Sequence, residues 1–226
     1  WDIAFDHEFN FIGTDNDQDQ GDRVFHSFFG AHYGWGHPWS AHWRCENHLP
    51  TPELVGPMFG GSGTGITYFD SPAFPPRLRG VWIFNDWLQR RSHYFKSEWQ
   101  GAQLTLAGTQ YSTLVSGGNA LFKPTDLEVG PDGALYILGW GREYGVQWDN
   151  NQKQINEGRI FRVCWKGNQA HAQLKQQHER WNTPLKDWST PELIDGLDDV
   201  LAVRRIAAQE ELILRKDGPS GIYVAL

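Results

Sequence analysis

Four aspartates lie within eight residues near the start of the chain: Asp15, Asp17, Asp19 and Asp22. Carboxylates this close repel one another unless a cation or a set of hydrogen-bond donors holds them. Asp15, Asp17 and Asp19 occupy alternate positions, as at the start of an EF-hand loop. Gly21 falls one residue late, however, and the twelfth position holds His26 rather than Glu, which argues against an EF-hand. We interpret the segment as either a calcium-binding loop between two β-strands or a solvated acidic turn.

The histidines and cysteines form no comparable motif. The nine histidines are spaced irregularly, without an H-E-x-x-H or H-x-x-E-H pattern, and no C-x-x-C-H haem-attachment motif occurs. Cys45 and Cys164 are far apart, so they either form a disulfide or are two unrelated buried thiols. The tryptophan-rich stretches Trp35–Trp39 and His42–Trp43 either stack on a sugar ring or fill gaps between β-sheets.

Charge and hydropathy exclude two classes of function. The net charge of −7 and the lack of a basic run argue against a nucleic-acid partner. No apolar stretch approaches the roughly 18 residues that a membrane-spanning helix needs. The chain begins at Trp1 inside a strand-like run and without Met, so we expect an upstream portion.

Short β-strands must position these groups. The composition combines 12 Trp, 13 Phe and 7 Tyr with 25 Gly, which suits short twisted strands better than a helical bundle. The clearest unit is a hairpin in which Asp126–Val129 and Ala134–Leu138 flank the turn Gly130-Pro-Asp-Gly133. Pro fixes φ and Gly accepts a positive φ in such a turn.

The strand pattern repeats along the chain. Ile3–Ile12 and Leu127–Ile137 both read as an apolar strand, an Asp-containing turn and an aromatic strand, and Thr67–Phe84 is a weaker copy. Repeats of a four-stranded unit favour a propeller over a sandwich. We therefore predict a mainly β fold, a partial β-propeller of about three blades over residues 1–165.

The C-terminal part has a different character. Residues 166–188 are predicted to be a linker, and residues 189–226 a short helical hairpin. Ser189-Thr-Pro-Glu192 supplies an N-cap hydroxyl, a Pro in the first turn and an early carboxylate. Val200–Leu214 has apolar residues at helical spacing. Because two helices cannot bury their apolar faces alone, we expect them to pack on a neighbouring unit.

Several motifs follow one another in the order found in a known family. They are Trp1-Asp-Ile-Ala-Phe5, the Asp15 loop, Gly30-Ala-His-Tyr-Gly-Trp35, Gly63-Thr-Gly-Ile-Thr67, Asp86-Trp87 and Val129-Gly-Pro-Asp-Gly-Ala-Leu-Tyr136. In this order the chain resembles the glucose/sorbosone dehydrogenase-like β-propellers of the pyrroloquinoline quinone (PQQ) dependent sugar dehydrogenase superfamily. It is most similar to the membrane-bound dehydrogenase-type propellers of planctomycetes, in which HEAT-like helices commonly follow the propeller.

The resemblance implies a set of site residues. In the quinone-dependent members the acidic loop approaches a calcium ion through backbone carbonyls, which correspond to Asp17 and Gln18. With the neighbouring carboxylates, the predicted metal ligands are Asp15, Asp17, Gln18, Asp19 and Asp22. Arginines grip the anionic quinone, and Arg90 or Arg91 matches that position. The general-base His of the family lies in an earlier blade, so no catalytic residue is assigned in this chain.

The resemblance also implies a function. It predicts a PQQ- and calcium-dependent sugar or alcohol dehydrogenase-like propeller, periplasmic or secreted. This polypeptide lacks the upstream base, so the missing blades would come from an upstream segment or a partner subunit. The alternative is a non-catalytic propeller that serves as a scaffold or carbohydrate-binding subunit. The first interpretation makes the protein an enzyme and the second does not, and the sequence does not distinguish between them.

Overall fold

The computed structural model describes residues 1–16, 21–31, 33, 54–118, 121–141, 147–155, 157–166, 174 and 179–215. The chain divides into two compact units. Unit 1 comprises Trp1–Phe69, Gly80–Glu128 and Ile137–Phe161, and unit 2 comprises Asp70–Arg79, Val129–Tyr136 and Arg162–Leu226. No helix within the described ranges is long and apolar enough to cross a membrane.

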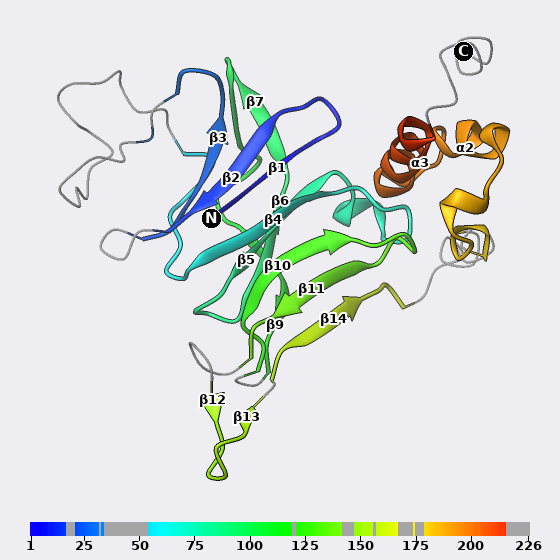
Figure 1. Cartoon of the computed structure of the whole chain (residues 1–226). Coiled ribbons are helices and arrows are strands. Elements are labelled where there is room, and N and C mark those ends of the chain that lie inside the picture. The colour runs from blue at the N-terminus through cyan, green and yellow to red at the C-terminus, as the bar shows by residue number, and fades with distance from the viewer. Residues whose placement is uncertain are drawn as a thin grey trace. The chain divides into compact units, whose positions relative to one another are not determined.

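Small β-sheets dominate the described chain (Figure 1). Three sheets have the strand orders β1-β2-β3, β4-β5-β6-β9 and β10-β11-β14, and two further pairs, β7-β8 and β12-β13, form ribbons. The strands are β1 (Asp2–Phe5), β2 (Phe11–Asp15), β3 (Arg23–Ser27), β4 (Gly63–Phe69), β5 (Val81–Asp86), β6 (Arg91–Phe95), β7 (Ser97–Gln100), β8 (Gln103–Leu106), β9 (Ser112–Ser116), β10 (Pro124–Val129), β11 (Leu135–Gly139), β12 (Gln147–Trp148), β13 (Gln154–Ile155) and β14 (Arg159–Val163).

The turn between β10 and β11 confirms the predicted hairpin. Gly130 N donates to Ala134 O at 2.8 Å, and Gly133 N donates to Gly130 O at 2.8 Å. Gly133 has a φ of +75°, the left-handed conformation that favours glycine. The Pro-Asp-Gly sequence therefore forms the tight turn for the reason that the sequence indicates.

The core of unit 1 lies between the β1-β2-β3 sheet and the β4-β5-β6-β9 sheet. Side chains of alternate residues meet there, including Ile12 and Val24 from the first sheet and Trp82 and Phe84 from the second, all with no solvent exposure. Opposite Ile12, the other face of the first sheet carries Phe11, which is 40% exposed. The first sheet thus buries one face and leaves an apolar face uncovered within the described chain.

The predicted fold class is confirmed at its coarser level. The described chain is mainly β, with antiparallel pairing in the β1-β2-β3 and β4-β5-β6-β9 sheets and few helices. Sheets of three or four strands are the size of propeller blades. The number of about three blades and the closure of a propeller stay predictions.

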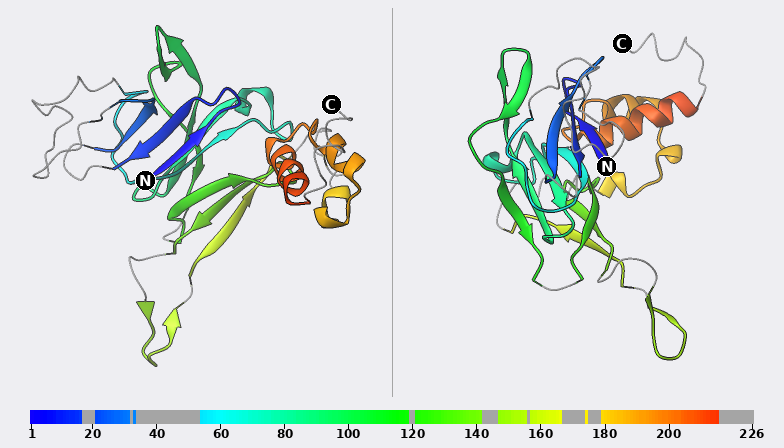
Figure 2. Two further views of the ribbon diagram at one scale, coloured as in Figure 1. Left: turned by 45° about the horizontal axis from the view of Figure 1, so that its top comes forward. Right: turned by 90° about the vertical axis from the view of Figure 1, so that its left-hand side faces the viewer.

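Two α-helices lie in the described part of unit 2. They are α2 (Thr190–Gly196) and α3 (Ala202–Leu214), and short 3₁₀ turns lie at η1 (Pro76–Leu78) and η2 (Leu185–Asp187). The helices pack side by side (Figure 2). At the N-cap of α2, the backbone N and Oγ of Ser189 both donate to Glu192 Oε2 at 2.7 Å. Both helices lie where the sequence predicts them, whereas their HEAT-like character and the domain limits stay predictions.

A small core holds the two helices together. Leu193 and Ala208 are fully buried, and Trp188 and Leu212 complete the cluster. Gly196 lies so close to α3 that an added Cβ would stand 3.0 Å from the Cβ of Ala208. The hairpin therefore depends on a small residue at the helix crossing as well as on its apolar faces.

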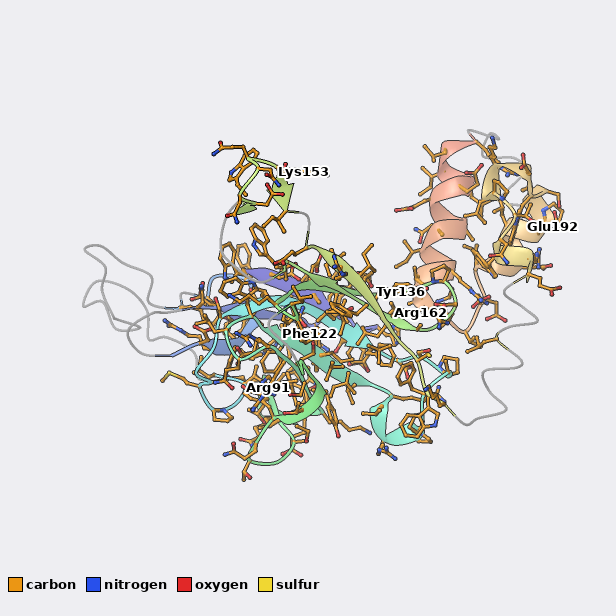
Figure 3. All side chains as sticks on the ribbon, turned by 90° about the horizontal axis from the view of Figure 1, so that it is seen from below. Arg91, Phe122, Tyr136, Lys153, Arg162 and Glu192 are labelled. Atoms are coloured by element: carbon orange, nitrogen blue, oxygen red, sulfur yellow. The ribbon has the colours of Figure 1, made fainter. Side chains whose placement is uncertain are left out.

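An ionic network joins the β10–β11 turn to β14 in unit 2. The Arg162 guanidinium lies 2.6 Å from Asp132 Oδ2, and the Tyr136 hydroxyl donates to the same oxygen at 3.1 Å (Figure 3). Burial of Asp132 opposes its ionisation, but the Ala134 amide, the Arg162 guanidinium and the Tyr136 hydroxyl outweigh it. Together these donors lower the pKa of Asp132 below its ordinary value.

This network makes part of the stability dependent on pH. Because the folded-state pKa of Asp132 is lowered, its contribution is complete above the ordinary carboxyl pKa of about 3.9 and is lost as the pH falls through the folded value. Arg162→Met should lower the free energy of unfolding at neutral pH by up to about 1 kcal/mol, since Arg162 is two-fifths exposed. Urea unfolding should show the difference from the native chain shrinking below about pH 4. A constant difference across that range would contradict this assignment.

Candidate functional site

A cavity of about 830 Å³ lies in unit 1, within the size range of ligand pockets. Strands β1, β4 and β10 supply residues to its wall, and so do the segments before β3 and β4 and those after β5 and β11. Its lining residues are Trp1, Asp2, Asn16, Gly21, Asp22, Gly60, Gly61, Ser62, Thr64, Gly65, Trp87, Leu88, Thr125, Asp126 and Trp140. Two side-chain types stand out in this set: indoles and carboxylates.

Trp1, Trp87 and Trp140 are the three indoles of the lining. Trp1 is 70% exposed and Trp140 is 49% exposed, so both present ring surface to solvent. Trp87 is held from two directions: its backbone N donates to Ser62 O at 2.8 Å, and the Lys123 ammonium lies 3.9 Å from its ring centroid. Indoles combine a large apolar face with a polar N–H.

Lys123 connects two of these indoles. Its ammonium lies over the Trp87 ring, and its backbone oxygen accepts a hydrogen bond from Trp140 N at 2.8 Å. A cation over an aromatic face is held by the ring quadrupole. Lys123 is therefore a positioning residue for this part of the wall rather than a member of the lining.

The three carboxylates of the lining are bonded to backbone amides. Asp2 Oδ1 accepts from Ile3 N and Asp2 Oδ2 from Ile66 N, both at 2.9 Å. Asp22 is 2% exposed and accepts from Gly63 N at 2.7 Å, and Asp126 accepts from Leu127 N at 2.8 Å.

Asp2 and Asp22 tie the first sheet to β4. Each uses a carboxylate oxygen to accept a backbone N–H of that strand, from Ile66 and Gly63 respectively. Thr14 makes a third link, because its Oγ1 donates to Thr64 O at 2.7 Å. The same residues therefore shape the cavity and join its walls.

Glycines bring the backbone close to these acids. A Cβ on Gly65 would stand 2.6 Å from Asp126 Cα, and a Cβ on Gly61 would stand 1.7 Å from Asp86 Oδ1. Contacts under 3.0 Å are not seen for real Cβ atoms, so both positions require glycine for close approach. Gly61, before β4, and Gly65, within β4, thus pack directly against acidic residues.

Asp86 and His93 lie behind the Gly61 segment. Asp86 has no solvent exposure, its Oδ1 accepts from Gln89 N at 2.8 Å, and its Oδ2 lies 3.8 Å from His93 Nε2. Within the described part of the chain, Asp86 Oδ2 and both His93 ring nitrogens have no hydrogen-bond partner. The pair is a buried polar contact next to the cavity wall and is not part of the lining.

Of the predicted metal ligands, the structure describes Asp15 and Asp22. Asp15, at the end of β2, lies 4.0 Å from Arg23 Nε and lines a second cavity of about 330 Å³. Asp22 lines the larger cavity. Asp17, Gln18 and Asp19 lie outside the described residues. Among those described, no group of three or more His, Cys, Asp or Glu residues could hold a metal ion, so the calcium site stays a prediction.

The predicted quinone ligands Arg90 and Arg91 lie at the turn between β5 and β6. Arg90 has a φ of +57°, and its backbone oxygen accepts from Gly117 N at 2.8 Å. Arg91 begins β6 and is exposed. Neither residue is in the lining of the cavity, and their role as cofactor ligands stays a prediction.

Other predictions fall on residues that the structure does not describe. The tryptophan-rich stretches Trp35–Trp39 and His42–Trp43 lie outside the described ranges, as does Cys45. Cys164 follows β14 and is half-buried. The two alternatives for the cysteines therefore remain as the sequence left them.

The sequence interpretation missed the combination of indoles and acids in the cavity. The sequence motifs and repeats contain Trp1-Asp2, Asp86-Trp87 and Asp126. These motifs indicated the fold, but they did not indicate that the residues line one cavity. The available signal was positional. Asp2 and Asp126 occupy corresponding places in two copies of the repeat, directly before Ile3 and Leu127.

The chain was compared with known proteins. No family model and no curated protein matches it. A glucose dehydrogenase structure is 16% identical in sequence, with a TM-score of 0.53. The alignment covers 73% of this chain and 44% of the glucose dehydrogenase chain. An oxidoreductase (glucose dehydrogenase) from Thermus thermophilus is 18% identical with a TM-score of 0.50, covering 71% and 43%. The PQQ-bound form of an aldose sugar dehydrogenase from Streptomyces coelicolor is 16% identical with a TM-score of 0.45, covering 71% and 41%.

The first two similarities show the fold of the chain. It is the fold of the corresponding part of the glucose dehydrogenases. The chain spans less than half the length of these structures.

Gly61→Ala tests the close approach at the cavity wall. The added methyl group must displace the buried Asp86 carboxylate, so we expect a loss of about 1–3 kcal/mol in the free energy of unfolding. Gly118→Ala is the matched control, because a Cβ there meets nothing within 4 Å. Chemical denaturation of both variants measures the difference, and equal stabilities would contradict the packing described.

Lys123→Met tests the cation over Trp87. It keeps the length of the side chain and removes the charge, so the free energy of unfolding should fall by about 0.5–1 kcal/mol. Lys123→Arg keeps the positive charge and should retain most of this contribution to the free energy of unfolding. Lys153→Met, in the exposed turn between β12 and β13, is the control and should have no effect. If Lys123→Met and Lys153→Met unfold alike, the contact contributes nothing measurable.

Proposed function

We propose that this chain is part of a sugar or alcohol dehydrogenase-like propeller and that its cavity binds a polyhydroxylated substrate. The support is threefold: the fold of glucose dehydrogenases, the order of motifs that resembles the PQQ-dependent superfamily, and the chemistry of the lining. The observation that carries the proposal is the meeting of three indoles and three carboxylates on one cavity. Each type of side chain matches one feature of a sugar.

A sugar ring has an apolar face of C–H groups and a rim of hydroxyl groups. The faces of Trp1 and Trp140 offer apolar platforms for the ring, and Trp87 adds a third indole held in place by Lys123. Carboxylates are acceptors with about four lone-pair sites each. Asp2 and Asp126 can therefore accept hydrogen bonds from substrate hydroxyl groups in addition to those from the backbone amides. The chain's own role is thus to bind and orient the substrate.

Calcium belongs to the proposal on the basis of the acidic loop. Calcium takes six to eight oxygen ligands, and the loop of Asp15, Asp17, Gln18, Asp19 and Asp22 is rich in them. In the described part of this loop, Asp22 already accepts Gly63 N and Asp15 lies beside Arg23. The described residues do not form the ion site, so its ligands would come mainly from positions 17–19.

PQQ belongs to the proposal on the sequence resemblance, with Arg90 and Arg91 as the residues to test. A quinone that carries several carboxylates needs cationic partners. The described lining offers three carboxylates and no Lys or Arg side chain. It therefore fits a hydroxylated substrate and does not fit the quinone, and we derive no chemical step through that group.

The proposal includes the rest of the propeller and its location. Ile3 and Phe5 of β1 and Phe11 of β2 are 50%, 50% and 40% exposed. Because the sheet leaves these apolar side chains exposed, we propose that upstream blades or a partner subunit pack there. A periplasmic or secreted location is proposed from the resemblance.

Sugar binding by the chain can be measured from its tryptophan fluorescence. Neutral sugars should change the emission in a saturable titration, and Trp140→Ala should weaken binding roughly three- to tenfold by removing one platform. Trp148→Ala is the control, because Trp148 is 61% exposed on β12 and is not in the lining. Failure of the folded chain to bind any neutral sugar or alcohol would contradict the proposal.

A second measurement distinguishes an enzyme from a binding propeller. Dye reduction with the bound sugar, dependent on added PQQ and calcium, would support the dehydrogenase. Sugar binding without dye reduction, both measured on the protein reconstituted with the missing blades, would instead assign a carbohydrate-binding subunit. Arg90→Ala and Arg91→Ala should impair reduction without affecting sugar binding if these arginines hold the quinone.

A further inference from the structure

The lining of the cavity is one-sided in charge. Asp2, Asp22 and Asp126 are its charged side chains, and the described lining has no Lys or Arg side chain to balance them. Lys123 stands next to the lining, but its ammonium is engaged with the Trp87 ring. A ligand in this cavity therefore meets an excess of negative charge.

Two of these carboxylates, Asp2 and Asp126, are bonded without a cationic partner among the described residues. The bonds of Asp2 and Asp126 go to backbone amides, and neither residue has an ion pair among the described residues. Asp126 is also exposed, so its charge faces solvent that a ligand would replace.

These observations define which sugars the cavity can accept. Neutral hydroxyl groups are donors to the carboxylates and carry no charge penalty. An ammonium substituent gains attraction, whereas a carboxylate or phosphate substituent meets like charges in a site that partly excludes water. Volume does not make this distinction, since a sugar and its acid have nearly the same shape.

On the basis of the proposed function, we infer that the cavity selects its substrate by charge: it accepts neutral and amino sugars and excludes sugar acids and sugar phosphates. Asp126 is the residue best placed to test this selection. It is exposed in the lining, and its one hydrogen bond among the described residues is to the amide of its own neighbour Leu127. Asp2 and Asp22, in contrast, also join the first sheet to β4, so their substitution would disturb the walls.

The test uses three sugars with one ring skeleton: D-glucosamine, D-glucose and D-glucuronate. At about pH 6 and low salt, carboxyl groups of ordinary pKa are ionised and the amine is protonated. Fluorescence titration of the whole chain should give the tightest dissociation constant for glucosamine, an intermediate one for glucose, and one at least tenfold weaker than glucosamine for glucuronate. The spread should narrow at about 1 M salt, where charges are screened within about 3 Å.

Two variants assign the effect to the cavity. Asp126→Asn keeps the shape and should reduce the ratio of the glucuronate to the glucosamine dissociation constants severalfold. Asp198→Asn removes the same charge from an exposed position in unit 2 and should leave the ratio unchanged. An equal effect of both variants would show that net charge, not the cavity, sets the order, and would overturn the inference.

The outcomes separate this inference from the proposed function. Equal affinities for the three sugars, or tightest binding of glucuronate, would overturn charge selection while the cavity remained a sugar site. No binding of any of the three by the folded chain would overturn the proposed function itself. Charge selection and the proposed function would both be supported if the three dissociation constants follow the predicted order and Asp126→Asn, but not Asp198→Asn, reduces their spread.

Discussion

The arrangement of unit 1 depends on one carboxylate that serves two strands. Asp2 accepts the amide of Ile3 in its own strand with one oxygen and the amide of Ile66 in β4 with the other. The first sheet and the second sheet are thereby joined at the rim of the cavity. Asp22 and Thr14 reinforce the same seam through Gly63 and Thr64. Because buried or half-buried backbone amides must be satisfied, the acids cannot be replaced by apolar residues without opening the seam.

This constraint couples structure and binding chemistry. Acids that join the walls by accepting backbone N–H groups also line the space between the walls. Glycines at 61 and 65 let the backbone approach these acids, and the indoles cover the apolar part of the lining. The ammonium of the adjacent Lys123 lies over the Trp87 ring. A cavity with this composition favours hydroxylated, uncharged ligands.

Much of the fold could be predicted from the sequence, because it depends on local patterns. The Gly130–Gly133 turn and the α2 cap at Ser189 both follow from neighbours in the chain. The cavity could not be predicted in the same way, since Asp2, Trp87 and Asp126 meet through the stacking of separate sheets. Sequence spacing drew attention instead to Asp15–Asp22, where carboxylates are adjacent. Of that segment the structure describes Asp15, whose carboxylate lies beside Arg23, and Asp22, which accepts the amide of Gly63.

The central claim is that the indole- and carboxylate-lined cavity is a sugar-binding site. A crystal structure of the chain with a neutral sugar tests it most directly. The account predicts a sugar ring against the faces of Trp1 or Trp140, with hydroxyl groups within hydrogen-bond distance of Asp2 or Asp126. A sugar bound elsewhere on the chain, with this cavity filled by water alone, would contradict the account.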